Sequence, residues 1–397
     1  MVERPASPAA IREHNLHVVL DALRAGRPAS RSDIAARTGL SKPTVGSALR
    51  SFEGAGIVRE FGRTTGHRGP GASLYDLVAE AALVLGVDVG SHYARAQLAD
   101  LDGEVVAELT IRLERPAAEA VVAALREVAA RIAAHAGQVE LAVVGSPGIV
   151  DPATGRISAA PNIAGWDGLV AEAVASTALG LPVVVDNDVN LAALGERRAG
   201  AGQDVDSFAY LSIGSGLGAG IVLHGRLHRG ARGAAGEVGF LPVGEDPFAL
   251  SQVGGRGAME ARLSTGGLLA VAERLAGTTT TELAAPFEVA DLFAAARAGD
   301  ALGRAVVAHT ARETAVCIAG LTSVVDLELV LLGGGIGTNG ELLLPDVRAA
   351  TAALVPAPPR IECAALADRA VTVGAVAVGL EHARTAVVRR LVDRVAV

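Results

Sequence analysis

Apolar residues in the first 78 positions recur at helical spacing three times, and two strand-like runs follow. NLHVVLDALRAG (15–26), SRSDIAARTGL (30–40) and SKPTVGSALRSFEGAG (41–56) each place apolar residues along one helix face. The second and third begin at Ser or Asp caps, and all three stop at glycine. The next stretch, IVREFGRTTGHRGPGASLYDL, predicts two short strands around a tip rich in Gly, Arg and His.

This order of elements predicts a winged helix-turn-helix over residues 1–78. On the third helix Val45, Leu49 and Phe52 face inward, so the polar side chains face out. Small polar residues at its start suit the major groove, and basic residues on the wing suit the DNA backbone or the minor groove. The predicted DNA-contacting residues are Lys42, Pro43, Thr44, Ser47 and Arg50 on the helix, and Arg63, His67 and Arg68 on the wing. The alternative is a helical protein–protein module with a solvated basic face.

From residue 79 onward, buried strand-like runs alternate with helical segments. ALVLGVDVGSHYARAQLADLDGEVVAELTI (82–111) predicts three strands joined by a glycine turn and a hairpin, and an Ala-rich helix follows at 116–136. The strand–glycine turn–strand order returns at 208–230, and a helical stretch at 289–323 precedes the strand LELVLL. We therefore expect two α/β lobes, 79–200 and 201–397, facing each other across a cleft, with the last helix packing back on the first lobe.

Composition narrows the class of protein. Half of the 397 residues are hydrophobic but only 3% are aromatic, which predicts cores of Ala, Val and Leu. Cys317 and Cys363 lie in apolar surroundings, so we expect buried small hydrophobes rather than a disulfide or a cysteine metal site. No apolar run approaches a membrane span, and the N-terminal stretch lacks the apolar segment of a signal peptide. A cytoplasmic protein without a membrane partner is expected.

Charge is distributed unevenly. Residues 1–78 hold 11 Lys and Arg against 7 Asp and Glu, whereas the rest of the chain holds 24 against 36. A basic head on an acidic body favours contact between the head and nucleic acid, although the excess is modest.

Six motifs in the body together resemble one family. GSPGIVDPATGRI, PNIAGW, DNDVNLAALGE, SIGSGLGAGIV, RGARGAAGEVGF and LLGGGIG follow the order of the ROK (repressor, open reading frame, kinase) family, and the resemblance covers nearly the whole chain. In that family, sugar kinases and sugar-responsive repressors share an actin-like (ribonuclease H-like) two-lobed α/β fold. The repressors add an N-terminal winged helix. The resemblance thus implies the fold and two candidate activities.

The resemblance also implies two hairpins that wrap ATP phosphates with backbone N–H groups, for which glycine leaves room. The candidate phosphate loops are Asp88 and Gly90 in the first hairpin, and Gly214, Ser215 and Gly216 in the second. The first hairpin departs from the family pattern D-x-G-G-T, because Ser91 and His92 replace glycine and threonine. An imidazole there should crowd a phosphate. Plain β-turns explain both segments equally well, and no ATP or magnesium is expected.

The sequence matches the family's sugar-contacting residues more completely than its phosphate-binding loops. The resemblance implies hydroxyl contacts from Gly148, Asn162, Asn187, Asp188, Glu237 and Glu260. Carboxylates and amides together accept from and donate to adjacent hydroxyls. Asp188 stands where the kinases have their general base. We expect it to act here as an inherited hydrogen-bond acceptor, with no catalytic residue in the chain. The alternative is that Asp186 or Asp188 caps the helix that follows.

The family's zinc site is absent from the sequence. Phe240 replaces the usual histidine, and Ser251, Val253 and Ala258 replace the three cysteines, while Gly254, Gly257 and Glu260 keep the register. These side chains cannot build a tetrahedral zinc site. We expect no structural metal, and apolar packing of Phe240, with Val253, to hold the loop.

Two hypotheses follow for function. The first is a sugar-responsive transcriptional regulator, by default a repressor of carbohydrate uptake or metabolism genes. It would bind operator DNA as a homodimer or dimer of dimers, and a sugar or sugar phosphate between its lobes. The second is an ATP-dependent sugar kinase with a regulatory head, in which Asp188 is the general base.

Overall fold

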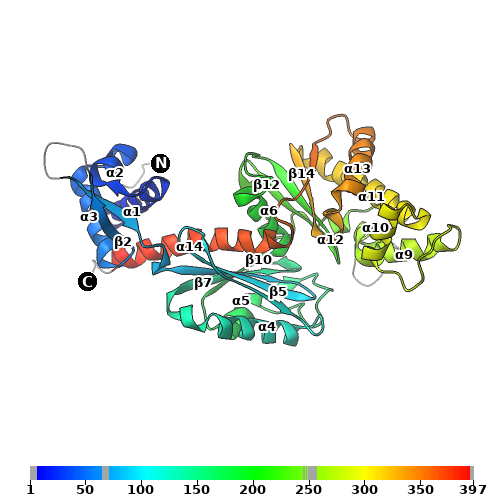
Figure 1. The fold of residues 1–397 in the computed structure, drawn as a ribbon, viewed down its shortest axis with the longest axis horizontal. Coiled ribbons are helices and arrows are strands. Elements are labelled where there is room, and N and C mark those ends of the chain that lie inside the picture. The colour runs from blue at the N-terminus through cyan, green and yellow to red at the C-terminus, as the bar shows by residue number, and fades with distance from the viewer. Residues whose placement is uncertain (1–6, 65–70, 245, 247, 249–256, 394–397) are drawn as a thin grey trace.

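The computed structural model describes residues 7–64, 71–244, 246, 248 and 257–393. The molecule is elongated, with a small head at one end and two lobes beyond it (Figure 1). One long helix near the C-terminus runs from between the lobes into the head.

The head has the predicted order of elements. Its helices are α1 Pro8–Ala25, α2 Arg31–Thr38 and α3 Lys42–Gly54, and its strands are β1 Ala29–Ser30, β2 Val58–Arg63 and β3 Ser73–Leu77. Ser30 and Asp33 form a capping box on α2, and Ser41 caps α3. Helix α1 begins earlier than the apolar stripe suggests, because Ser7 caps it and a proline stands in its first turn. The inward residues Val45, Leu49 and Phe52 are fully buried.

The first lobe contains a five-stranded sheet in the order β10-β7-β4-β5-β6. The strands are β4 Leu83–Val89, β5 Tyr93–Asp100, β6 Val105–Arg112, β7 Val139–Ser146 and β10 Val183–Asn187. Helices α4 Ala118–Arg131 and α5 Ala171–Leu179 lie together on one side of this sheet (Figure 1). The predicted helix over 116–136 is shorter, because the chain continues as the 3₁₀ segment η2 Ala133–Gln138. A small hairpin of β8 Ile149–Val150 and β9 Ile157–Ser158 projects from the lobe.

The second lobe repeats this plan with a sheet in the order β13-β12-β11-β14-β15. Its strands are β11 Phe208–Ile213, β12 Leu217–Leu223, β13 Arg226–Leu227, β14 Leu329–Gly333 and β15 Arg360–Cys363. The helical stretch predicted at 289–323 is two helices, α10 Val289–Ala298 and α11 Ala301–Val325, separated at Gly299. Further helices are α8 Glu260–Leu263, α9 Thr265–Ala276, α12 Gly334–Gly337 and α13 Gly340–Leu354. Cys317 is buried as expected, but Cys363 is only half-buried, because β15 is the edge strand.

Two helices, α6 Asp188–Ala199 and α14 Ala370–Asp393, pack against each other between the two sheets. Helix α14 also packs on β4 and β7 of the first lobe and reaches α1 of the head. By length and composition α14 could cross a membrane, but half of its most apolar stretch is buried inside the molecule. We therefore interpret α14 as a core helix. One continuous apolar cluster joins Leu23 of the head, Val84 of β4 and Val388 of α14, so the head is packed onto the body rather than tethered to it.

Candidate functional site

A cavity of about 510 Å³ lies where the strand ends of both lobes meet the first turns of α6 and α14. Ligand sites of α/β proteins are commonly found at the carboxyl ends of strands. All the predicted sugar-side and phosphate-side residues line this cavity. They are Gly148, Asn162, Asn187, Asp188, Glu237 and Glu260 on the sugar side, and Asp88, Gly90, Gly214, Ser215 and Gly216 on the phosphate side. Their contacts with a ligand remain predictions.

Asn187 is the residue that caps α6. Its side-chain oxygen accepts from the backbone N–H of Asn190 at 3.0 Å, and its amide nitrogen donates to the Gly148 carbonyl at 3.0 Å. The alternative that Asp186 or Asp188 caps this helix is therefore wrong. Asn187 fixes both the start of α6 and the Gly148 loop, a double role that a local sequence motif does not reveal.

Asp186 forms an ion pair instead. Its carboxylate accepts from the Arg229 guanidinium at 2.6 and 3.1 Å, which joins β10 to the loop after β13. Sequence reasoning missed Arg229, because the two residues lie far apart in the chain. The pair positions the segment that leads to Glu237.

Gly236 explains how Glu237 reaches the cavity. Gly236 adopts a φ of +87°, and a Cβ on it would lie 1.7 Å from the carbonyl oxygen of Ala219. That carbonyl belongs to β12, and the Ala219 amide donates to Gly236 at 2.8 Å. The glycine thus allows the segment to lie directly on β12 and to present the next residue to the cavity.

Carboxylates crowd the cavity wall and raise one another's pKa. Burial raises the pKa of Asp188 to about 8, and the neighbouring charges of Asp88 and Glu237 add to this effect. Burial likewise raises the pKa of Asp88 to about 6, against the opposing effect of Arg95. The pKa of Glu237 rises to about 7 through burial and the charge of Glu260. At neutral pH Asp188 is therefore largely protonated and Glu237 partly so, and these two carboxyls can donate to sugar hydroxyls as well as accept from them.

The loop that carries Asn162 is anchored by Trp166, the only tryptophan in the chain. Its ring is buried, and its Nε1–H donates to the Ser146 hydroxyl at 2.9 Å at the end of β7. Sequence analysis included Trp166 in a motif without assigning it a role. Aromatic residues are scarce in this chain, so its one tryptophan could have been predicted to be buried and to anchor the loop that carries Asn162.

The glycines of the second hairpin have a packing reason as well as a possible ligand reason. A Cβ on Gly220 would lie 2.5 Å from the Val189 carbonyl oxygen and 2.7 Å from the Ala193 Cβ. Gly218 lies against the Val189 side chain in the same way. Close packing of α6 on β12 thus requires Gly220, which follows the candidate phosphate loop formed by Gly214, Ser215 and Gly216.

His92 in the first hairpin is not among the described residues that line the cavity. Its side chain is exposed and lines a separate hollow with Arg112 and Arg115. The expectation that this imidazole crowds a phosphate inside the cavity is therefore not met. Ser91, the other departure from the family pattern, does line the cavity.

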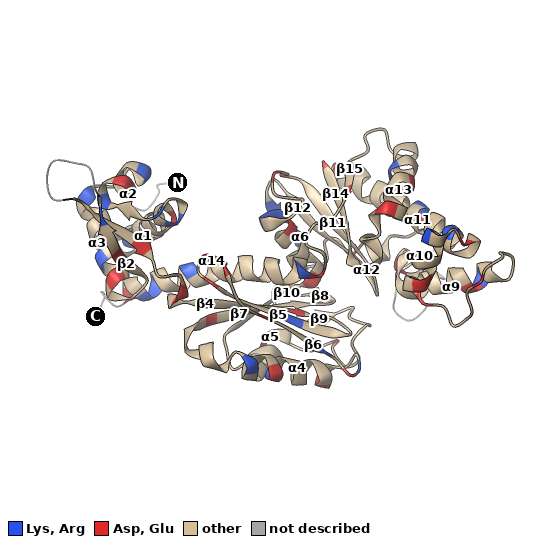
Figure 2. Cartoon of the chain, in the orientation of Figure 1, with Lys and Arg blue, Asp and Glu red and all other residues tan. Residues whose placement is uncertain are grey.

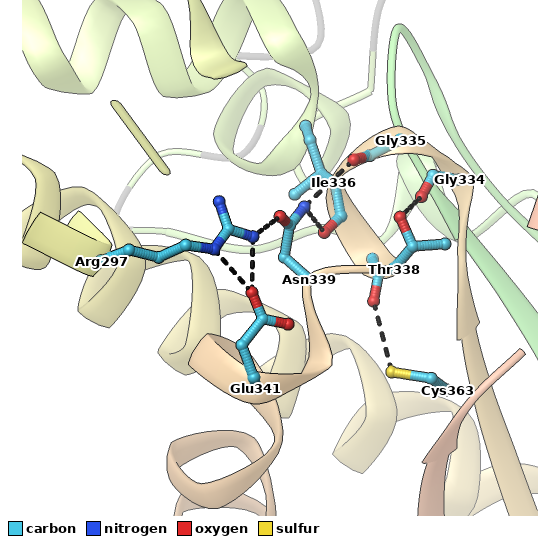
Figure 3. A network of polar contacts seen from close by, with 9 residues as sticks. Arg297, Gly334, Gly335, Ile336, Thr338, Asn339, Glu341 and Cys363 are labelled. Atoms are coloured by element: carbon cyan, nitrogen blue, oxygen red, sulfur yellow. Dashed lines mark hydrogen bonds and ion pairs between the residues drawn. The ribbon is translucent and has the colours of Figure 1, made fainter. Parts of the chain in front are cut away.

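On the second-lobe side, the turn after β14 is held by a polar network (Figure 3). Arg297 of α10 donates to the Glu341 carboxylate at 2.8 Å and to the Asn339 side-chain oxygen at 2.6 Å. Asn339 in turn donates to the carbonyls of Gly335 and Ile336. Since Gly335 lines the cavity, this network fixes the second-lobe wall of the cavity.

Gly257 and Met259, in the described part of the segment that replaces the zinc motif, contact the backbone of Gly239. Phe240 is 48% exposed, so the expectation that its packing holds the loop is wrong. The amide of Met259 donates to the Gly239 carbonyl at 3.1 Å, and Gly257 touches the same carbonyl so closely that a Cβ would not fit. Among the described residues no group of three or more His, Cys, Asp and Glu is placed to hold a metal. Ser251, Val253 and Gly254 lie outside the described residues, and Ala258 is buried.

The predicted DNA-contacting face is on the outer side of α3. Lys42, Pro43, Ser47 and Arg50 are exposed, and Thr44 is half-buried. Figure 2 shows basic residues gathered over α2 and α3 of the head. On the wing Arg63 is exposed and lies 4.0 Å from Glu60, while His67 and Arg68 lie outside the described residues.

Comparison with known proteins places the whole chain among regulators and kinases of one family. The ROK family model matches residues 84–381, and the model of the IclR helix-turn-helix domain matches residues 17–60. A putative xylose repressor from a Caldicellulosiruptor species is 30% identical over 86% of this chain and 88% of its own.

Comparison with solved structures agrees with these sequence matches. A ROK family transcriptional regulator, described as a homologue of the E. coli MLC protein, matches with 25% identity and a TM-score of 0.79 over 96% of this chain and 99% of its own. A ROK family glucokinase from Streptomyces griseus, in complex with glucose and AMPPNP, matches with 29% identity and a TM-score of 0.65 over 75% of this chain and 99% of its own. The family match, the two-lobed fold and the added head agree, and the chain belongs to the ROK family.

Proposed function

We propose that this protein is a transcriptional repressor that binds operator DNA through its head and is released when a sugar binds between its lobes. The observation that carries the proposal is the path of α14. Val371 at its first turn lines the cavity, and Val388 near its other end belongs to the apolar cluster that joins the head to the body, where α14 packs on α1. A helix of 24 residues spans about 36 Å.

Polar contacts tie the far end of α14 to both the head and the first lobe. Arg389 lies 3.5 Å from Glu13 of α1, and Arg390 pairs with Glu140 of β7 at 2.6 and 2.7 Å. Arg27 after α1 also pairs with Asp102 in the turn between β5 and β6. The orientation of the head therefore follows that of the first lobe.

A second link joins the sugar-side residues to the start of α14. Glu196 of α6 is fully buried, and its carboxylate accepts from the backbone amides of Ala365 and Leu366 at 3.1 and 2.8 Å. These residues lie between β15 and α14. A ligand that draws Asp188, the first residue of α6, toward the second lobe would move both helices together.

The switch needs only a difference in sugar affinity between two lobe arrangements, of the order of a few kcal/mol. In this proposal the repressor acts as a homodimer, because one winged helix contacts too little DNA for useful specificity. It works in the cytoplasm, where operator DNA is found, without zinc or ATP. Xylose is the first sugar to test, since the similar repressor is named for it.

The test begins with DNA. Selection from random duplexes with the full-length protein should enrich a sequence with two half-sites one or more helical turns apart. Titration of xylose, glucose and N-acetylglucosamine into that complex should then release it for one of them. Failure to enrich any sequence would refute the repressor. Enrichment without release by any sugar would refute the sugar response alone.

The second candidate is an ATP-dependent sugar kinase, and the match to a glucokinase with bound glucose and AMPPNP favours it. Asp188 lines the same cavity as both glycine hairpins, as that chemistry requires. A coupled assay with ATP, magnesium and the same sugars distinguishes the two. Turnover at about 1–100 per second, abolished by Asp188→Asn, would establish the kinase.

A further inference from the structure

Two arginine side chains from different helices of the head meet beside Gly46 of α3. Arg31 is the first residue of α2, and Arg50 lies one turn after Gly46 on α3. A Cβ at Gly46 would lie 3.6 Å from Nη1 of Arg50, and 3.8 and 3.9 Å from Cδ and Nε of Arg31. The two guanidinium groups therefore lie close together, next to the backbone of the predicted recognition helix.

Both arginines are exposed, in the part of the head where basic residues gather over α2 and α3 (Figure 2). Arg50 was predicted to contact DNA from its position on α3. Arg31 was not, because its place beside α3 depends on how α2 and α3 pack against each other. The pair thus joins one predicted DNA contact to a second cation that a local sequence pattern does not reveal.

Tyr75 holds Arg31 in place. The Tyr75 side chain lies on β3 and is only 2% exposed. A terminal N–H of Arg31 donates to the Tyr75 hydroxyl, and its guanidinium carbon lies 5.3 Å from the centre of the Tyr75 ring. An arginine that is already held in one orientation loses little further side-chain freedom when it binds an anion.

The charge of this pair is not neutralised within the described part of the chain. Neither Arg31 nor Arg50 forms an ion pair there, whereas Arg27 pairs with Asp76 and Asp102. The carboxylate of Asp33, in the first turn of α2, accepts from the Ser30 amide and hydroxyl instead. Two neighbouring cations that face solvent without a carboxylate are arranged to accept an external anion.

We infer that Arg31 and Arg50 together bind one phosphate group of the operator backbone, and that Tyr75 positions Arg31 for this contact. The inference rests on the proposed function and assigns a further residue of the DNA-binding surface. The planar donor fork of arginine matches phosphate oxygens, and a phosphate between the two guanidinium groups would remove their mutual repulsion. Because phosphate contacts set register rather than read bases, Arg50 has a positioning role on the DNA.

The first experiment removes each arginine. Operator affinity is measured with the full-length protein by fluorescence anisotropy between about 50 and 200 mM salt. Arg31→Ala and Arg50→Ala should each weaken binding at least about ten-fold, and each should reduce the salt slope by about one for every head bound. Arg126→Ala, an exposed arginine on α4, is the control and should change neither quantity. Unchanged affinity in Arg31→Ala would overturn the inference while the repressor itself stands.

The second experiment tests whether the two arginines share one phosphate. Operator duplexes are made with a single neutral methylphosphonate at each backbone position in turn. At one position in each half-site, the unmodified protein should lose affinity, and neither Arg31→Ala nor Arg50→Ala should weaken binding there any further. If neutral groups at two different positions cancelled the effects of the two variants, the shared phosphate would be wrong. A protein that enriches no DNA sequence would overturn the proposed function, and this inference with it.

Tyr75→Phe tests the positioning role. The substitution keeps the buried ring and removes the hydroxyl that accepts from Arg31. We expect operator binding to weaken about three-fold in the unmodified background and not at all in the Arg31→Ala background, because the hydroxyl acts only through Arg31. An equal loss in both backgrounds would show that the hydroxyl supports the fold of the head and does not position Arg31.

Discussion

Gly195 of α6 and Gly374 of α14 lie in direct backbone contact at the crossing of the two helices. A Cβ on Gly374 would lie 1.8 Å from the Leu191 carbonyl oxygen and 2.9 Å from the Gly195 nitrogen. A Cβ on Gly195 would lie 2.1 Å from the Ala370 carbonyl oxygen. The two helices that join the cavity to the head therefore touch without intervening side chains, and a shift of one displaces the other.

Gly374→Ala should force these helices apart. Overpacking of this kind costs about 1–3 kcal/mol of unfolding free energy, and the coupling between sugar and operator should weaken as well. Thermal unfolding and sugar-dependent operator binding measure the two effects. Gly54→Ala is the matched control, because nothing lies within 4 Å of the added methyl group. Equal melting temperatures for the two variants would contradict the close crossing.

Asp188→Ala should separate sugar binding from DNA binding. The carboxylate lines the cavity at the first residue of α6, far from α3. Removal of the carboxyl leaves a buried sugar hydroxyl without its partner, which costs about 1–3 kcal/mol, so sugar affinity should fall roughly five-fold to a hundred-fold. Calorimetry and fluorescence anisotropy measure the two affinities.

The control for that variant is Asp346→Ala, which removes an exposed carboxylate from α13. It should change neither affinity. If Asp188→Ala lost operator binding while keeping its sugar affinity, the assignment of Asp188 to the sugar would be wrong.

The stability of the protein should depend on pH through Asp188. Its pKa is raised from 3.8 to about 8 in the folded state, so the folded protein holds a proton that the unfolded chain releases. This contribution is fully present below about pH 4 and is lost as the pH rises toward 8.

Asp188→Asn removes that titration. At pH 8 the variant should be more stable than the parent by about 1–3 kcal/mol, and the gain should vanish near pH 4. Chemical denaturation across this pH range measures it. A variant less stable than the parent at pH 8 would show that hydrogen-bond partners stabilise the ionised Asp188, and that burial and neighbouring carboxylates do not destabilise it.

Arg50→Ala should weaken operator binding by about 1–3 kcal/mol, because Arg50 is exposed on the outer face of α3. A phosphate contact would also reduce the salt dependence of binding, and a base contact would relax sequence preference at one position. Arg126→Ala on α4 removes an equal charge from the body and serves as the control. If Arg50→Ala left the operator affinity unchanged, the assignment of α3 as the DNA-recognition helix would be wrong.

The sequence predicted the helices of the head and the strands that carry the site, because caps, glycines and apolar periods are local signals. The resemblance to the ROK family also predicted which side chains line the cavity, because its motifs could be matched residue by residue. Neither predicted the contacts between distant segments. Asn187 rather than an aspartate caps α6, Arg229 pairs with Asp186, and Glu196 holds the amides before α14.

Phe240 shows a different limit. An aromatic residue at a former metal position suggested apolar packing, but the side chain is largely exposed. The backbone contact of Gly257 with Gly239 holds the segment instead. A contact between two glycines leaves no hydrophobic pattern in a sequence.

In the proposed mechanism one thermodynamic coupling joins the sugar cavity to the DNA-binding face. Its most direct test is the operator dissociation constant, measured on the full-length protein with and without the saturating sugar. We expect the operator dissociation constant to rise at least about ten-fold when sugar is saturating. Because coupling is reciprocal, the sugar dissociation constant should rise by the same factor when operator is saturating. Equal operator affinity with and without a sugar that demonstrably binds would contradict the account.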